Sequence, residues 1–393
     1  MRVDDIRLDS NRAWFELSAR ITMDRLDTCG LRIWFRGPNE YANGELDASP
    51  FLPGLLATAM WWGEPLTIEA PVSAQLLDAV PLAIHRYQSM FPSLRAVPVS
   101  APGRTLASTS GATACFFTRG IDSWYSVLTN VEGVDRSRPP VTHLLHVSGI
   151  DWALTAPTLE REIAATRAAA ATAGCELVLV ETNLRDFTER FQPWDVTHGG
   201  ALAAAGLALG TRFSHVLMAS TFPLYRLQPW GSHPMLDPLW STERTAIVHD
   251  AAEISRADKF AFLADHSRAL ANLKVCFEVD SEYNCGVCEK CMLTMVGLRA
   301  AGVREDLDGF AVPLDAWRLA SHAVSTANRQ LVPELAERLV HPEDRPYRLA
   351  LECMMLRGDL TSALRRLVRI AQMAVRARAR RARDFITPCS TPG

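Results

Sequence analysis

Residues 113–128 read TACFFTRGIDSWYSVL, and this stretch carries the main signal for the fold. Its first six residues form an apolar run of strand length that ends in a polar, glycine-containing turn, and the residues from Trp124 onward have a helix-like composition. A strand, a glycine-containing loop and a helix in this order leave unpaired backbone amides at the helix N-terminus, which favour phosphate. The loop is not a Walker A motif, because no Gly-Lys-Ser/Thr follows it.

The segments that follow continue this alternation of strand and helix. Apolar runs of strand length occupy residues 113–118, 142–149, 176–182 and 215–220. Segments of helical composition between them span residues 124–129, 159–172 and 198–213. Such alternation predicts an α/β fold with a doubly wound parallel sheet. Ligands of these sheets bind beyond the carboxyl ends of the strands, where residues 118–123 fall.

The flanking regions predict two further parts of the chain. Residues 1–104 combine two strand-like runs, 12–21 and 30–37, with helical segments, and a Pro-, Ser- and Gly-rich linker follows. The expected domains are a small N-terminal α+β domain, a central α/β domain and a helical C-terminal extension, over residues 1–104, 105–305 and 306–393.

Composition indicates a globular protein without a membrane span. The 393 residues are 48% hydrophobic and 22% charged, with a net charge of −3, and no apolar run reaches the roughly 18 residues that cross a bilayer. Eight arginines lie between Arg365 and Arg383. They predict either an RNA-binding helix or a solvated basic helix in an arginine-rich chain, and we favour the second.

Four cysteines have the spacing of a metal centre. Cys276, Cys285, Cys288 and Cys291 follow the pattern C-x8-C-x2-C-x2-C, which lets four thiolates meet at one tetrahedral ion, and Gly286 supplies a tight turn. We expect structural zinc, with an iron–sulfur cluster, reduced thiols or disulfides as the alternatives. Five other cysteines are scattered and no signal peptide opens the chain, so we expect a cytoplasmic protein.

The loop resembles the PP-loop, Ser-Gly-Gly-x-Asp-Ser, of the N-type ATP pyrophosphatases. The six positions in register are Thr118, Arg119, Gly120, Ile121, Asp122 and Ser123. The 7-cyano-7-deazaguanine synthases of this superfamily carry zinc on C-x8-C-x2-C-x2-C, C-terminal to the ATP loop, and this chain is similar in spacing and order. The resemblance covers residues 110–300 and implies an adenine nucleotide alpha hydrolase-like fold; the flanking domains depart from the family.

The resemblance implies ATP, magnesium and zinc as cofactors, and an activity. PP-loop enzymes join a substrate oxygen to the α-phosphate of ATP, release pyrophosphate, and let ammonia, an amine or sulfur displace AMP. The implied acceptor is a small molecule or nucleobase with a carboxylate, amide or carbonyl group. Asp122 would bind magnesium or fix the loop, Thr118 and Ser123 would donate hydroxyls, and Ser220 and Lys259 would complete the nucleotide site.

Arg119 is the departure from the motif, because arginine replaces the first glycine. Either ATP chemistry is lost and the protein only binds nucleotide, or the guanidinium grips phosphate oxygens. An RNA-modifying, thiolation-type enzyme is a further alternative, and the sequence leaves a homo-oligomer open. In the segment PWGSHPMLDPLWST and the THGG turn, His198, His233 and Asp237 are candidates for substrate contact.

Overall fold

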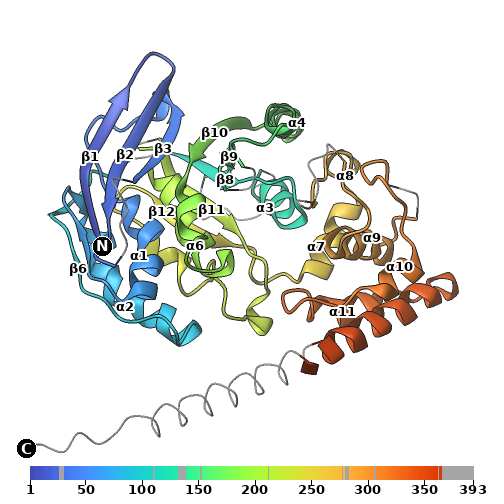
Figure 1. The fold of residues 1–393 in the computed structure, drawn as a ribbon. Helices are drawn as coiled ribbons and strands as arrows, with labels where there is room; N and C mark the ends of the chain where they lie inside the picture. The colour runs from blue at the N-terminus through green and yellow to red at the C-terminus, as the bar shows by residue number, and fades with distance from the viewer. Residues whose placement is uncertain are drawn as a thin grey trace, which may run out of the picture. The chain divides into compact units, whose positions relative to one another are not determined.

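The computed structural model describes residues 1–25, 31–108, 111–131, 139–150, 153–210, 212–276, 278, 283–304, 307–361 and 363–364. Two compact units make up the chain: Met1–Cys285 with Leu307–Ala311, and Gly286–Asp306 with Val312–Gly393. The first unit contains a mostly parallel, ten-stranded sheet covered by helices, which confirms the predicted α/β class (Figure 1).

Five parallel strands form one half of this sheet. They are β8 (Ala112–Phe116), β9 (Val141–Ser148), β10 (Glu176–Thr182), β11 (Phe213–Ala219) and β12 (Ala246–Asp250). Their order is β12-β11-β8-β9-β10, so the first strand, β8, lies in the middle of this half. The carboxyl ends of all five lie at one edge. The sequence pattern located four of these strands to within a few residues and missed β12.

The N-terminal strands extend the same sheet. Strand β3 (Arg32–Pro38) pairs antiparallel with β10, and β2 (Trp14–Thr22), β1 (Arg2–Ser10), β4 (Leu66–Ile68) and β6 (Val99–Ser100) follow in that order (Figure 1). Two short strands, β5 (Val72–Ser73) and β7 (Gly103–Arg104), form a separate pair. The expected boundary at residue 104 therefore falls inside the first compact unit.

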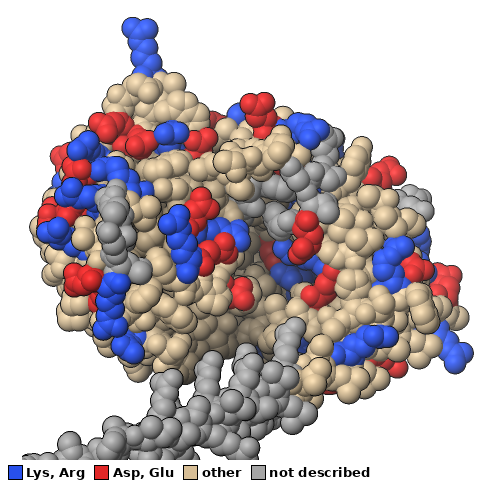
Figure 2. Space-filling model, viewed as in Figure 1, with Lys and Arg blue, Asp and Glu red and all other residues tan. Residues whose placement is uncertain are grey.

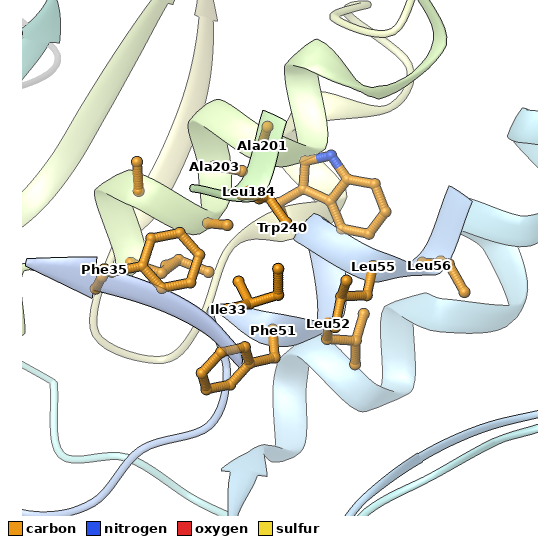
Figure 3. Close-up of a cluster of buried hydrophobic side chains, with 14 of the residues drawn as sticks. Ile33, Phe35, Phe51, Leu52, Leu55, Leu56, Leu184, Ala201, Ala203 and Trp240 are labelled. Atoms are coloured by element: carbon orange, nitrogen blue, oxygen red, sulfur yellow. The ribbon is translucent and has the colours of Figure 1, made fainter. Parts of the chain in front are cut away.

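One hydrophobic core joins the N-terminal segment to the parallel strands. Figure 3 shows Phe35 of β3 beside Phe51 of α1 (Phe51–Trp62), with ring centroids 5.8 Å apart. Leu184 of α5 (Leu184–Thr188) and Ala201 of α6 (Trp194–Leu207) belong to the same buried cluster. Each of these side chains is at most 1% exposed, so residues 1–104 bury their apolar surface against the rest of the unit.

Helices cover both faces of the parallel strands. Leu145 and Val147 of β9 face the core shared with α1 and α6, so the alternate residues Leu144 and His146 face the opposite side. There α3 (Ile121–Val131) packs on β8 and β9, and α4 (Leu159–Thr172) packs on β9 and β10. Helix α7 (Arg256–Ala264) packs on α3, and α8 (Ser267–Ala271) packs on α4 and α7.

Several helix limits differ from the sequence pattern. Helix α3 begins at Ile121 rather than Trp124, and α6 spans Trp194–Leu207 rather than 198–213. By contrast α4 has the predicted limits, and α2 (Ala74–Met90) accommodates Pro81 in its interior. The early start of α3 places Asp122 and Ser123 in its first turn.

The described residues of the second unit are mainly helical. It contains α9 (Glu289–Ala300), α10 (Ala316–Ser321), α11 (Leu331–Arg338) and a helix over residues 345–361. Buried Asp344 accepts hydrogen bonds from Arg299 at 2.7 Å and Arg304 at 2.6 Å, which ties the α9 segment to the start of that last helix. The arginine-rich segment Arg365–Arg383 lies outside the described residues.

On the face shown in Figure 2, neither basic nor acidic side chains predominate among the described residues. There, Lys and Arg side chains are interspersed with Asp and Glu, in keeping with the net charge of −3. Within the described ranges, no helix is both long and apolar enough to span a bilayer.

Candidate functional site

Residues 117–120 connect the carboxyl end of β8 to the N-terminus of α3. Three side-chain contacts shape this loop. Ser123 Oγ donates to Gly120 O at 3.0 Å, Gly120 N approaches Thr118 Oγ1 at 3.4 Å, and the Thr118 and Ser123 hydroxyls lie 3.4 Å apart. A Cβ atom at Gly120 would meet nothing closer than 3.3 Å, so packing alone does not demand glycine there. The strand, loop and helix have the predicted order.

Asp122 is clamped by two cations from α7. Arg256 donates to both Asp122 carboxylate oxygens, and Lys259 Nζ lies 3.2 Å from Oδ1. Burial opposes ionisation of Asp122, but the charges of Arg256 and Lys259 outweigh it and hold the pKa of Asp122 below its usual value. A carboxylate held by two cations is a poor ligand for a third, so the donor set favours the loop-fixing role over magnesium binding.

Lys259 also connects the loop to the end of β11. Its ammonium donates to Ser220 O at 2.6 Å, and its side chain is only 1% exposed. Burial lowers the pKa of Lys259, although the Asp122 carboxylate acts in the opposite direction. Ser220 N donates to Asp250 O at 2.8 Å, at the end of β12. The predicted residues Asp122, Ser220 and Lys259 therefore meet at the carboxyl edge, between β8 and β11.

Arg119 keeps the backbone conformation of a glycine. Its φ of 61° lies in the left-handed region, which costs a non-glycine residue about 1–2 kcal/mol. The guanidinium forms a buried ion pair with Glu162 of α4, with side chains 8% and 1% exposed. Lys274 Nζ lies 3.7 Å from the same carboxylate, and Lys274 N donates to Arg119 O at 3.0 Å. Glu162 is not among the residues predicted from the sequence, because a carboxylate on an amphipathic helix predicts solvent exposure.

Two buried polar side chains at the end of β9 were also missed. Both ring nitrogens of His146, which is 1% exposed, and the hydroxyl of Ser148 have no hydrogen-bond partner among the described residues. Burial, and then the charge of Arg119, lower the pKa of His146 to about 4, so its ring is neutral at pH 7. Polar residues in an otherwise apolar strand were the only available signal.

The four cysteines converge as their spacing predicts. Their sulfur atoms all lie within 4.8 Å of one another, with Cys276 and Cys291 buried and Cys285 and Cys288 partly exposed. A tetrahedral zinc site with Zn–S bonds of about 2.3 Å fits this donor set. Cys288 also caps α9, because Cys291 N donates to Cys288 Sγ at 3.4 Å.

Backbone and amide contacts support the cysteine cluster. Gly286 has a φ of 71°, and a Cβ atom there would lie 2.3 Å from Val312 O, so the predicted tight turn requires glycine. Buried Asn284 accepts from Val275 N at 2.7 Å and Cys276 N at 3.1 Å. Its amide also donates to Leu273 O at 2.9 Å and Gly309 O at 3.0 Å. Asn284 therefore holds residues 273–276 next to the segment that contains Cys285.

The remaining candidates form a separate polar group. Asp237 is fully buried and accepts from His233 N at 3.2 Å and from Ser232 Oγ at 2.6 Å. Ser232 N donates to His198 Nε2 at 3.2 Å, so the structure brings the three predicted residues together. It adds His249 of β12, whose Nδ1 lies 2.7 Å from Asp237 Oδ2. These contacts indicate that Asp237 holds the 232–240 segment in place.

Comparison of the chain with protein families, with curated proteins and with solved structures finds no match. The resemblance to PP-loop enzymes rests on the loop at residues 118–123, on the cysteine spacing and on their order in the chain.

Proposed function

We propose that the protein is a PP-loop-type ATP pyrophosphatase with a doubly wound sheet, in which residues 118–123 receive the phosphates of ATP. One observation carries this proposal. At the carboxyl edge, the N-terminus of α3 and two cations that share one carboxylate lie where β8 meets β11. There the chain connections of the parallel half diverge, which is the usual ligand position in such sheets. A helix N-terminus and cationic side chains both favour a polyanion.

The chemistry follows from the residues at this edge. An acceptor oxygen would attack the α-phosphorus of ATP, forming a P–O bond while the bond to the bridging α–β oxygen breaks and its electrons leave with pyrophosphate. Arg256 and Lys259 would stabilise the charge that develops on the departing group, together with the amides of the first turn of α3. Ammonia, an amine or sulfur would then attack the activated carbon, and AMP would leave. The acceptor class we propose is a carboxylate, amide or nucleobase carbonyl.

Magnesium would arrive bound to the phosphate oxygens of ATP and would neutralise their negative charge. Because cations hold both Asp122 oxygens, Asp122 would fix the loop rather than bind magnesium. The proposed setting is the cytoplasm, where thiolates remain reduced and available for zinc.

A protein that binds nucleotide without turning it over is the second candidate. The observation that favours it is the ion pair between Arg119 and Glu162, which occupies the guanidinium that would otherwise grip phosphate. In that case ATP would bind, but no acceptor would promote formation of AMP and pyrophosphate.

The test is a measurement of products and affinity on the full chain loaded with zinc. Candidate acceptors are screened with MgATP for AMP and pyrophosphate, and formation of ADP would refute the assignment. In parallel, ATP is titrated by calorimetry into wild type and Gly120→Ala. We expect about tenfold weaker binding by the variant, because its methyl group stands where phosphate approaches the backbone. Gly44→Ala is the matched control, since a Cβ atom at Gly44 meets nothing within 4 Å.

A further inference from the structure

Residues 273–276, which end at the first cysteine and are called the first cysteine arm, contact the loop at residues 118–123 directly. Lys274 precedes the first cysteine ligand by two residues, and its amide donates to Arg119 O at 3.0 Å. Its carbonyl oxygen lies 3.9 Å from the Cβ position of Gly120, and its ammonium lies 3.7 Å from Glu162, the ion-pair partner of Arg119. Residues 273–276 therefore contact the loop through the Lys274 backbone, and the Lys274 side chain reaches Glu162, the ion-pair partner of Arg119.

Asn284 determines the position of this arm. Its side chain makes four hydrogen bonds with backbone groups, at Leu273, Val275, Cys276 and Gly309. Two of the three bonded residues of the arm flank Lys274 in the sequence. Because Asn284 directly precedes Cys285, a metal ion that joins Cys276 to Cys285 and the Asn284 side chain act on the same short segment.

We propose that metal binding at the four cysteines holds the 118–123 loop in its phosphate-binding shape, with Asn284 as the positioning residue between the two. Arg119 adopts a left-handed conformation that a non-glycine residue avoids unless its surroundings impose it. The hydrogen bond from Lys274 N and the pairing with Glu162 are the contacts that impose it. Release of the 273–276 arm removes the first contact, so the loop gains access to other conformations. This coupling concerns the loop itself, and only its consequence for affinity rests on the proposed function.

The experiment follows amide hydrogen exchange in the full chain without nucleotide. Exchange of peptides covering residues 117–124, 273–276 and 32–38 is compared for protein with one zinc per chain, for protein stripped by a chelator, and after zinc is restored. We expect stripping to accelerate exchange at 117–124 by about five- to tenfold, as loss of one or two hydrogen bonds allows, and zinc to reverse it. Exchange at 32–38, in β3, stays unchanged.

A second arm uses Asn284→Ala, because stripping the metal could unfold the whole unit. With zinc bound, this variant is expected to accelerate exchange at 273–276 and at 117–124 together. Asn183→Ala is the matched control: Asn183 also bridges backbone groups, at Trp34 N (3.0 Å) and Arg32 O (2.8 Å), but lies away from the cysteine arm in sequence. It should accelerate exchange at 32–38 and leave 117–124 as in wild type.

The outcomes separate this inference from the proposed function. Faster exchange at 273–276 with unchanged exchange at 117–124, in either the stripped protein or Asn284→Ala, overturns the coupling. Acceleration at 32–38 to the same extent in Asn284→Ala also overturns it, because the arm then stabilises the unit as a whole. Titration of pyrophosphate completes the test, with about fivefold weaker binding expected for Asn284→Ala. Absence of binding by wild type would refute the proposed function and leave the exchange result standing.

Discussion

Substitution of Glu162 by glutamine tests whether the buried ion pairs of Glu162 stabilise the loop. Glu162 is 1% exposed and shares its carboxylate between Arg119 and Lys274. Removal of one partner from a buried ion pair costs about 3–5 kcal/mol, because the remaining charge is left without compensation. Glutamine has nearly the same shape, and its amide oxygen can still accept one hydrogen bond from Arg119. We therefore expect Glu162→Gln to lower the free energy of unfolding by about 3 kcal/mol, the lower end of that range.

The assay is urea unfolding of the zinc-loaded full chain, followed by tryptophan fluorescence. Glu16→Gln is the control, since Glu16 pairs with Arg36 at 2.8 Å in a setting where the side chains are 32% and 40% exposed. Exposed pairs contribute at most about 1 kcal/mol, so this variant should unfold near the wild-type midpoint.

A double-mutant cycle assigns the effect to Arg119. In the Arg119→Gly background, glycine tolerates the left-handed backbone, and Lys274 is the cation that remains paired with Glu162. There Glu162→Gln should cost about 1–2 kcal/mol less than in wild type. A cost below 1 kcal/mol in wild type, or an equal cost in both backgrounds, would show that the ion pair does not hold the loop.

Three further predictions concern the cysteine centre and the cation clamp. Cys288→Ser should reduce zinc to well below one per chain by elemental analysis and destabilise the protein by several kcal/mol, whereas iron in place of zinc would identify a cluster instead. Gly286→Ala should lower zinc affinity, because its methyl group would lie 2.3 Å from Val312 O; affinity equal to wild type in a competition with a chelator would contradict this. The pKa of Asp122 is depressed in the folded state, so its stabilising effect is present above about pH 3.9 and is lost as the pH falls through the folded pKa. Unfolding measured against pH should therefore show a smaller acid-induced loss of stability for Asp122→Asn than for wild type, and parallel curves would exclude stabilisation by the Arg256 and Lys259 clamp.

The convergence of the four cysteines and the positions of four parallel strands along the chain could be predicted from the sequence, because both depend on local signals. The C-x8-C-x2-C-x2-C spacing constrains the distance between thiolates along a short chain, and the sulfur atoms indeed converge within 4.8 Å. Likewise, apolar runs of strand length marked β8, β9, β10 and β11, and α4 was placed with its observed limits. The turn at Gly286 follows from the same local geometry.

Contacts between segments far apart in the chain required the tertiary structure. Strand β12 is short and mixed in polarity, so only its pairing with β11 defines it. The attachment of residues 1–104 to β10 depends on pairing between Arg36 and Glu181, which are 145 residues apart.

The charge pattern of the candidate site was decided in the same way. The sequence pointed to Asp122, Arg119 and Lys259 but could not pair them, because a carboxylate and a cation attract one another only when the fold brings them close. Packing of α4 on β9 and β10, and of α7 on α3, pairs Arg119 with Glu162 and Asp122 with Arg256 and Lys259. Local spacing thus determines where the loop and the cysteines lie in the chain, and long-range packing determines which charges remain for a ligand.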